Sequence, residues 1–144
     1  MASLLMPAAM ASTHAAAFTR SRPWSEVEFA ELLDNRLTFV VGDERCFALI
    51  RVIVDEAELL TIATHPDHQR QGLARAVMTD WQAQAAQRGA VTAFLEVAAD
   101  NRQACHLYAV SGYSICGNRP AYYPRQDGTA VDAQMMRRAL PTAN

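Results

Sequence analysis

The stretch over residues 56–75 constrains the fold of this chain more than any other part of the sequence. An apolar, strand-prone run ends at Pro66, a short polar loop with one glycine, Gly72, follows, and a helical pattern begins directly after it. Such an order forms an anion site, because the first N–H groups of a helix have no intrahelical partner and the helix dipole adds positive charge there. The stretch therefore predicts a ligand that carries phosphate.

Length and charge narrow the class of protein. A chain of 144 residues that is 51% hydrophobic and 19% charged is expected to form one globular domain over residues 1–144. With a net charge of −2, the chain has no basic field that would favour nucleic acid as a partner. All thirteen basic residues are arginine, which excludes a lysine Schiff base and a Walker-type phosphate loop.

Cysteine usage and hydropathy indicate a cytoplasmic protein. The three cysteines are far apart and form no C-x-x-C motif, so we expect neither a disulfide framework nor a metal site. The alanine-rich start of the chain lacks the basic residues that open a signal peptide, and Pro7 and His14 interrupt it. No apolar run approaches the roughly 20 residues needed to cross a bilayer, so no membrane partner is expected.

The hydrophobic pattern predicts a mixed α/β sheet, antiparallel for the most part, with helices on both faces. Two helices, over 7–18 and 25–35, precede three antiparallel strands over 37–41, 45–54 and 56–66. A helix over 73–88 crosses to a strand over 91–97, which makes that strand pair parallel. The expected remainder is a helix over 100–112, a strand over 113–117, a loop over 118–128 and a strand over 129–138.

The loop Gln69-Arg70-Gln71-Gly72-Leu73-Ala74 is the candidate phosphate site. Gly72 lacks a Cβ where a backbone has to approach a ligand, and Arg70 and Arg75 supply positive charge on either side. The loop does not match G-x-G-x-x-G, which argues against a dinucleotide fold. A plain strand-to-helix turn without a ligand is the alternative reading.

This loop also resembles the Q/R-x-x-G-x-G/A signature of the GNAT acetyltransferases, which bind the pyrophosphate of acetyl-CoA. Within that superfamily, the chain is similar to the bacterial N-acetyltransferases that modify the N-terminal alanine of a small-subunit ribosomal protein. Ala74 stands for the more usual final glycine, and Thr64-His65 for a more familiar apolar-acidic pair. The supporting segments are Pro23-Trp24-Ser25, Asp55-Glu56-Ala57, Ile62-Ala63, the QRQGLA loop, Leu95-Glu96-Val97, Asn101, Leu107-Tyr108, Gly112-Tyr113 and Tyr122-Tyr123-Pro124.

The resemblance implies acetyl-CoA as co-substrate and the N-terminus of a protein, a small-subunit ribosomal protein, as acceptor. It also implies the GNAT fold, in which a central parallel strand pair splays open to take the pantetheine arm. Asn101 has an alternative role, because a residue at that position can cap its helix. The residues expected at acetyl-CoA are Ile62, Ala63, Thr64, Arg70, Gln71, Gly72, Leu73, Ala74, Arg75 and Asn101.

Glu96 is a candidate general base. A glutamate in the middle of a strand is poorly suited to it, so its side chain either faces solvent or lines a site. The resemblance implies the second, with Glu96 acting through water. Removing a proton from an α-amine at neutral pH costs about 1–2 kcal/mol, against roughly 4–5 kcal/mol for a lysine side chain. A weak carboxylate base therefore suits an α-amine acceptor.

Tyr108 is a candidate general acid. It could simply fill the core, but the resemblance implies that it protonates the leaving thiolate. The presence of Glu96 and Tyr108 favours an enzyme over a non-catalytic acetyl-CoA-binding module, and a small-molecule amine acetyltransferase is a nearer alternative. Glu56 and Glu58 are alternative partners for the substrate ammonium. The residues expected at the substrate are Trp24, Glu28, Glu56, Tyr122 and Tyr123.

Overall fold

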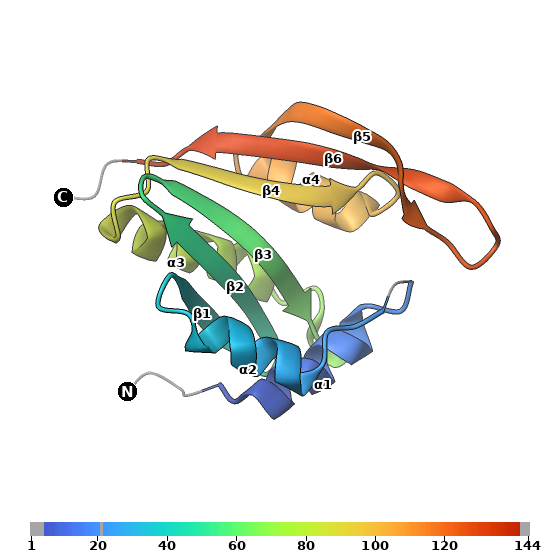
Figure 1. The fold of residues 1–144 in the computed structure, drawn as a ribbon, viewed down its shortest axis with the longest axis horizontal. Helices are drawn as coiled ribbons and strands as arrows, with labels where there is room; N and C mark the ends of the chain where they lie inside the picture. Colours follow the sequence, from blue (N-terminus) through green and yellow to red (C-terminus); the bar gives the residue numbers. More distant parts are fainter. Residues whose placement is uncertain (1–4, 21, 142–144) are drawn as a thin grey trace.

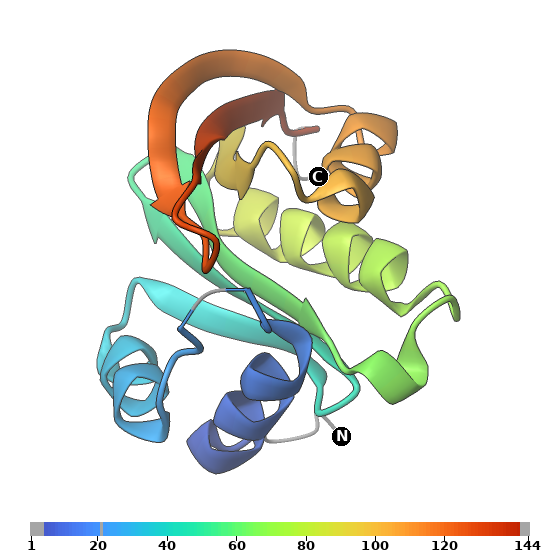
Figure 2. The same ribbon diagram turned by 90° about the vertical axis from the view of Figure 1, so that its right-hand side faces the viewer.

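The computed structural model describes residues 5–20 and 22–141. Residues 1–4, in the segment weighed as a signal peptide, and Ser21, in the predicted break between the first two helices, lie outside the described part, as do residues 142–144. A six-stranded mixed sheet has the order β1-β2-β3-β4-β6-β5. Helices α1 (Pro7–Ala17) and α2 (Glu26–Asp34) cover one face, and α3 (Leu73–Gln87) and α4 (Arg102–Val110) cover the other (Figures 1 and 2).

The first three strands form the predicted antiparallel meander: β1 (Thr38–Asp43), β2 (Cys46–Ile53) and β3 (Glu56–Thr64). The turn between β1 and β2 depends on Gly42, whose φ is +106°. A Cβ at Gly42 would lie 2.2 Å from the carbonyl oxygen of Cys46, so a side chain cannot be accommodated there without movement of the backbone.

The crossover from β3 through α3 to β4 (Thr92–Ala98) produces the predicted parallel strand pair. After β3 the chain forms a short 3₁₀ turn, Pro66–His68, and then the loop that precedes α3. Helix α3 buries four apolar side chains at helical spacing against the sheet: Val77, Met78, Trp81 and Ala85. Leu73 and Ala74, which the same spacing places on this face, are half-buried.

Strand β5 (Ser114–Pro124), which pairs with β6 (Ala130–Ala139), corrects the prediction of a loop over 118–128. Because β5 is at the edge of the sheet and pairs on one side only, it tolerates Pro120, which has no N–H to donate. Register shifts between Ile115 and Gly117 and between Arg119 and Tyr123 interrupt its ladder. The prolines and the irregular spacing of apolar residues hide the alternation that is typical of a strand, so the sequence predicts a loop here.

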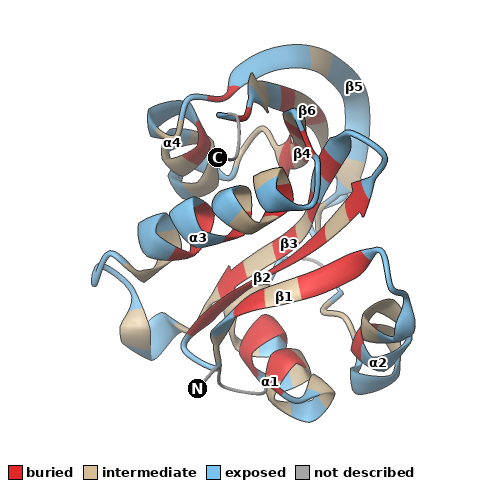
Figure 3. Cartoon of the chain, turned by 90° about the vertical axis from the view of Figure 1, so that its left-hand side faces the viewer, coloured by how far each residue is buried: buried red, intermediate tan, exposed pale blue. Residues whose placement is uncertain are grey.

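Two apolar clusters stabilise the molecule, one on each face of the sheet (Figure 3). The larger joins α3 and α4 to the sheet, and the smaller joins α1 and α2 to β2 and β3. In α2 the buried residue is Phe29, whereas Val27 is exposed. Within the described ranges no helix combines the length and the apolar character needed to cross a membrane.

Candidate active site

An opening between β3 and β4 is the centre of the candidate site. The two strands pair only from Glu56 and Thr92 to Glu58 and Phe94. Beyond this, within the described residues, they diverge without pairing to each other (Figure 1). The facing backbone N–H and C=O groups are available to an extended ligand, as they would be to an added strand. The expected splayed strand pair is confirmed, and Ile62, Ala63 and Thr64 lie in its diverging part.

A β-bulge turns β3 at this opening. Leu49 of β2 pairs with Thr61 and the next residue, Ile50, pairs with Leu59, which makes Leu60 an extra residue in β3. A bulge changes the side-chain alternation, so Leu59 faces the α3 side and Thr61 faces the α1 side. Sequence reasoning missed the bulge, because leucine is an ordinary strand residue and carries no bulge signal.

His14 holds the bulged part of β3 from the α1 side. Its Nδ1 accepts a hydrogen bond from the backbone N–H of Trp24 at 3.1 Å, and its Nε2 lies 3.2 Å from Oγ1 of Thr61. Because Nδ1 is an acceptor, Nε2 carries the proton, and this N–H donates a hydrogen bond to Oγ1 of Thr61. Burial lowers the pKa of His14 to about 4, so the ring is neutral at physiological pH.

Glu96 lies on β4 at the opening and points to the α1–α2 side of the sheet. Its neighbours Leu95 and Val97 are buried on the opposite face, so the strand alternation directs Glu96 away from them. The hydroxyl of Tyr123 donates to one carboxylate oxygen at 2.9 Å, and Nε of Arg119 lies 3.4 Å from the other. With 26% of its side chain exposed, Glu96 is held in a polar site that water can still reach.

Tyr108 lies on α4 and packs against the other face of the sheet. It is 5% exposed, and its ring meets that of Tyr113 edge to face with 6.1 Å between centroids. Burial raises the pKa of Tyr108 above its usual value, and the nearby groups of Cys105 and Tyr123 add to the effect. The phenol therefore stays protonated and can donate a proton, although it also fills the core.

The loop before α3 presents polar hydrogens to open space. Arg70 and Gly72 have positive φ values of 64° and 75°, and a Cβ at Gly72 would meet no atom within 4 Å. The first intrahelical bond comes from the N–H of Ala76, so the N–H groups of residues 73–75 are unpaired within the helix. Gln71 and Arg75 are exposed, as is Arg70, while Leu73 and Ala74 are half-buried. These donors fit a pyrophosphate group.

Asn101 caps α4, which confirms the alternative considered for it. Its Oδ1 accepts a hydrogen bond from the N–H of Ala104 at 3.2 Å, and its amide nitrogen remains for another contact. The sequence pattern predicted a helix that starts at Asp100, but α4 starts after the N-cap Asn101. Asp100 instead accepts two hydrogen bonds from Arg125, at 2.9 and 2.7 Å, and one from Arg20 at 3.4 Å. This cluster joins the end of β4 to the β5–β6 hairpin and to the segment after α1.

Trp24 and Glu28, expected at the substrate, have structural contacts in the α1–α2 layer. The ring of Trp24 stacks on that of His14 at 5.3 Å. Glu28 completes a capping box with Ser25 and binds Arg22 through both oxygens, at 2.7 and 3.0 Å. Ser25 and Glu28 have the S-x-x-E spacing that is typical of such a box.

Glu56 is separated from Glu96 by the structure. It is exposed and lies opposite Thr92, four residues before Glu96, which is about 13 Å along the strand. This placement argues against the expected contact between Glu56 and the substrate amine. Glu58, the other candidate, lies nearer but forms an ion pair with Arg51. The register in which β3 pairs with β4 sets the distance between Glu56 and Glu96, and this register cannot be predicted from the sequence of either strand alone.

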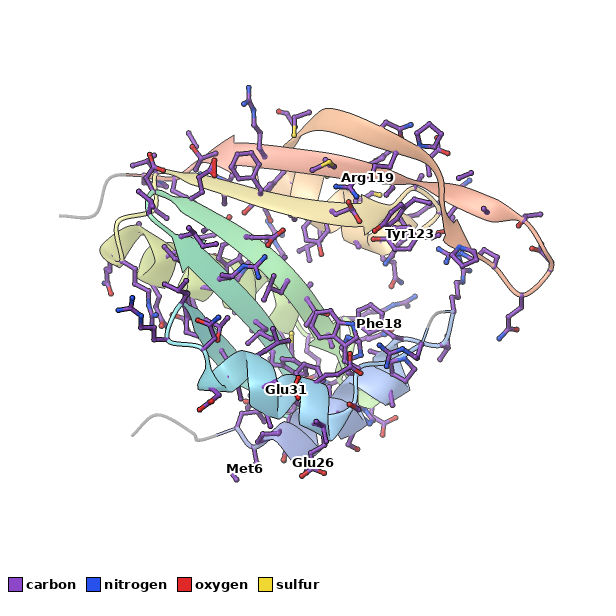
Figure 4. All side chains as sticks on the ribbon, viewed as in Figure 1. Met6, Phe18, Glu26, Glu31, Arg119 and Tyr123 are labelled. Atoms are coloured by element: carbon purple, nitrogen blue, oxygen red, sulfur yellow. The ribbon has the colours of Figure 1, made fainter. Side chains whose placement is uncertain are left out.

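Tyr122 and Tyr123 lie next to each other on β5, edge to face with 5.1 Å between ring centroids. Tyr123 contacts Glu96, whereas Tyr122 is exposed and lies 5.2 Å from the guanidinium carbon of Arg119. Arg119 and Tyr123 lie on the β4–β5 side of the opening, and Phe18 lies on the opposite side (Figure 4). Sequence reasoning missed Arg119, because it stood in a predicted loop with no register to β4.

Comparison with known proteins identifies the class. The model of the acetyltransferase (GNAT) family matches residues 7–113, and the chain belongs to this family of acetyltransferases. The [ribosomal protein bS18]-alanine N-acetyltransferase of Escherichia coli K12 is 42% identical over 123 residues, 83% of this chain and 81% of that protein. The protein of the same description from Salmonella typhimurium LT2 is 40% identical over 126 residues, with the same coverage. The crystal structure of the ribosomal-protein-S18-alanine N-acetyltransferase from E. coli matches with a TM-score of 0.84 at 34% identity, covering 96% of this chain and 90% of that one.

Proposed function

We propose that this chain is an acetyl-CoA-dependent N-α-acetyltransferase whose acceptor is the N-terminal alanine of a small-subunit ribosomal protein of the bS18 type. One observation carries the proposal: Glu96 and Tyr108 lie on opposite faces of a strand pair that opens beside them. The E. coli and Salmonella relatives, which match over four-fifths of the chain, support this choice of acceptor. Both proposed reactants belong to the cytoplasm, which is the compartment we infer.

The α3 side of the sheet is proposed to hold acetyl-CoA, which supplies the acetyl group as a thioester. The unpaired N–H groups at the start of α3, together with Arg70 and Arg75, would bind the pyrophosphate. The open edge of β3 at Ile62, Ala63 and Thr64 would bind the pantetheine amides, and Asn101 would contact the same ligand through its amide nitrogen. A backbone N–H near Ile62 would donate to the acetyl oxygen.

The opposite side of the sheet is proposed to receive the acceptor amine. Glu96 would accept a proton through a water molecule, and Tyr123 holds its carboxylate in place. The proton to be removed from an α-ammonium costs only about 1–2 kcal/mol at neutral pH. A carboxylate of ordinary basicity is therefore sufficient, which favours an α-amine over a lysine side chain as acceptor.

Tyr108 is proposed to return a proton to the sulfur that leaves. Its burial keeps the phenol protonated, and its place on α4 sets it on the α3–α4 side of the sheet, where the cofactor would lie. Base and acid are thus separated by the opening through which the two reactants meet. Direct transfer needs no covalent enzyme intermediate, and no cysteine has to react.

Intact-mass spectrometry tests the proposal. A peptide that begins with alanine and contains one internal lysine, incubated with acetyl-CoA, should gain one acetyl group, and fragmentation should locate it on the first residue. The matched control is the same peptide with a blocked N-terminus, which should stay unmodified. Acetylation of the lysine, or of a small polyamine in place of the peptide, would contradict an N-terminal acceptor.

A further inference from the structure

The irregular part of β5 brings two side chains to one carboxylate. Arg119 pairs with Ala133 and Tyr123 pairs with Val131, so a four-residue step on β5 lies opposite a two-residue step on β6. Four residues of a regular strand span about 13 Å, whereas two span about 7 Å. Only because the chain bulges between them do Arg119 and Tyr123 both reach Glu96.

Asp132 of β6 fixes this bulge. Its Oδ1 accepts a hydrogen bond from the backbone N–H of Ala121 at 2.9 Å, and its Oδ2 accepts one from the side-chain amide of Asn118 at 3.2 Å. Ala121 has a φ of 49°, which is costly for a residue with a side chain, and Pro120 has no N–H to give to the ladder. The carboxylate of Asp132 therefore accepts a backbone N–H inside the bulge, after Arg119, and binds the side chain of Asn118 just before Arg119.

Arg119 is the cation in contact with Glu96. Its Nε lies 3.4 Å from Oε2 of Glu96, whereas Arg51 and Arg125 are bound to Glu58 and Asp100. The remaining ionisable groups near Glu96 on its own side of the sheet are Glu58 of β3 with Arg51 of β2, Arg137 of β6, Tyr123 of β5, and Asp100 after β4 with Arg125 of the β5–β6 hairpin. Tyr108 of α4 lies on the opposite face.

We propose that Arg119, held by the bulge that Asp132 clamps, is a specificity-determining residue that selects the neutral form of the acceptor amine. This inference rests on the proposed function. An ammonium group that approached Glu96 would lie beside a fixed positive charge, and the repulsion favours loss of its proton before transfer. An α-amine tolerates this, because a substantial fraction is neutral at pH 7–8, whereas a lysine amine is almost wholly charged.

The pH dependence of turnover tests the role of Arg119. With a peptide whose only amine is its N-terminal alanine, Arg119→Ala should raise the pH at which kcat is half-maximal by roughly half to one pH unit. Arg119→Lys, which keeps the charge, should bring the half-maximal pH most of the way back to that of the parent enzyme. Asp132→Ala should raise the half-maximal pH as well. In the Arg119→Ala background it should cause little further rise, because Asp132 acts through Arg119. Asp127→Ala, in the turn of the same hairpin, is the matched control and should leave the profile unchanged.

Proton release on binding gives a second readout that does not need turnover. When the same peptide binds to the enzyme with CoA at pH 7, calorimetry in buffers of different ionisation enthalpy should detect protons released from the parent enzyme and fewer from Arg119→Ala. Asp132→Asn, which keeps one oxygen for Ala121, serves if Asp132→Ala does not fold. An equal fall in kcat at every pH, with unchanged proton release, would overturn the inference and leave the proposed function intact. A parent enzyme that acetylates no peptide α-amine would instead remove the proposed function.

Discussion

Tyr108 and Tyr113 are two buried phenols in contact, and their hydroxyl groups have different surroundings. Burial raises the pKa of both. The hydroxyl of Tyr113 donates to Oε1 of Gln82 at 2.8 Å, which ties it to α3. Tyr108 instead lies near Tyr123, which contacts Glu96. Of the two, Tyr108 is therefore the one close to the contact between Tyr123 and Glu96.

Replacing Tyr108 with phenylalanine should reduce kcat by about 100-fold or more, because a positioned general acid contributes at least that factor. Acetyl-CoA affinity should stay within about twofold, since the ring and its packing remain. Thiol release measures kcat and calorimetry measures affinity. Tyr113→Phe is the control, with near-normal kcat and a loss of about 1 kcal/mol in the free energy of unfolding. Equal turnover in the two variants would remove Tyr108 from the acid role.

His14 should make stability depend on pH. Because burial lowers its pKa to about 4 from an ordinary value near 6.5, the unfolded chain binds a proton more readily than the folded one between these values. This contribution is full above pH 6.5 and declines as the pH falls towards 4, by at most about 1.4 kcal/mol per pH unit.

The difference between parent and variant isolates the effect of His14. Denaturant unfolding at several pH values should give a shallower decline between pH 6.5 and 4 for His14→Gln than for the parent. The matched control is His106→Gln, which replaces an exposed histidine of α4 and should follow the parent curve. Parallel curves for the parent and His14→Gln would show that His14 is not the titrating group.

At the scale of elements, two glycines have positive φ in different surroundings: Gly72 at the N-cap of α3 and Gly42 near the end of β1. Gly72 begins α3 in open space, whereas Gly42 turns β1 against the backbone of β2. Both have positive φ, which costs a side chain about 1 kcal/mol. Only at Gly42 does a steric clash with Cys46 add to this cost.

Gly72→Ala should therefore lower the free energy of unfolding by about 1 kcal/mol, and Gly42→Ala by more than about 2 kcal/mol. Gly72→Ala should still weaken acetyl-CoA binding several-fold, because the added methyl group occupies the open space before α3. Denaturant unfolding and calorimetry measure the two effects. Unchanged acetyl-CoA affinity in a folded Gly72→Ala protein would count against a phosphate site at this loop.

The elements that sequence reasoning predicted are those with strong local periodicity. Helix α3 and the β1–β3 meander follow from apolar spacing, and the box at Ser25 and Glu28 marks the start of α2. The two bulges were not predictable, since Leu60 and Ala121 adopt their conformations through pairing with distant strands. The site shows the same division. Glu96 and Tyr108 stand out by residue type and motif, but Arg119 and Asp132 acquire their contacts from the bulge in β5.

At the scale of the molecule, the sheet separates the two proposed binding regions. The anion loop leads into α3 on one face, and the Glu96–Tyr123 contact lies on the other. Separate apolar clusters stabilise the two layers. Substitutions on opposite faces share no contact, so their effects on transition-state binding should add.

Arg70→Ala and Tyr123→Phe test this separation. Arg70→Ala should raise the KM for acetyl-CoA, most strongly at low salt because the exposed guanidinium acts at long range. Tyr123→Phe should lower kcat/KM for the acceptor peptide, because it removes the hydrogen bond to Glu96. The change in RT ln(kcat/KM) for the double variant should equal the sum of the changes for the two single variants, within about 0.5 kcal/mol. Tyr123→Phe combined with Glu96→Gln is the matched contrast, since the two residues share one hydrogen bond and should not add. If the cross-sheet pair couples as strongly as the contact pair, the sheet does not divide the site, and the acid and base act as one unit.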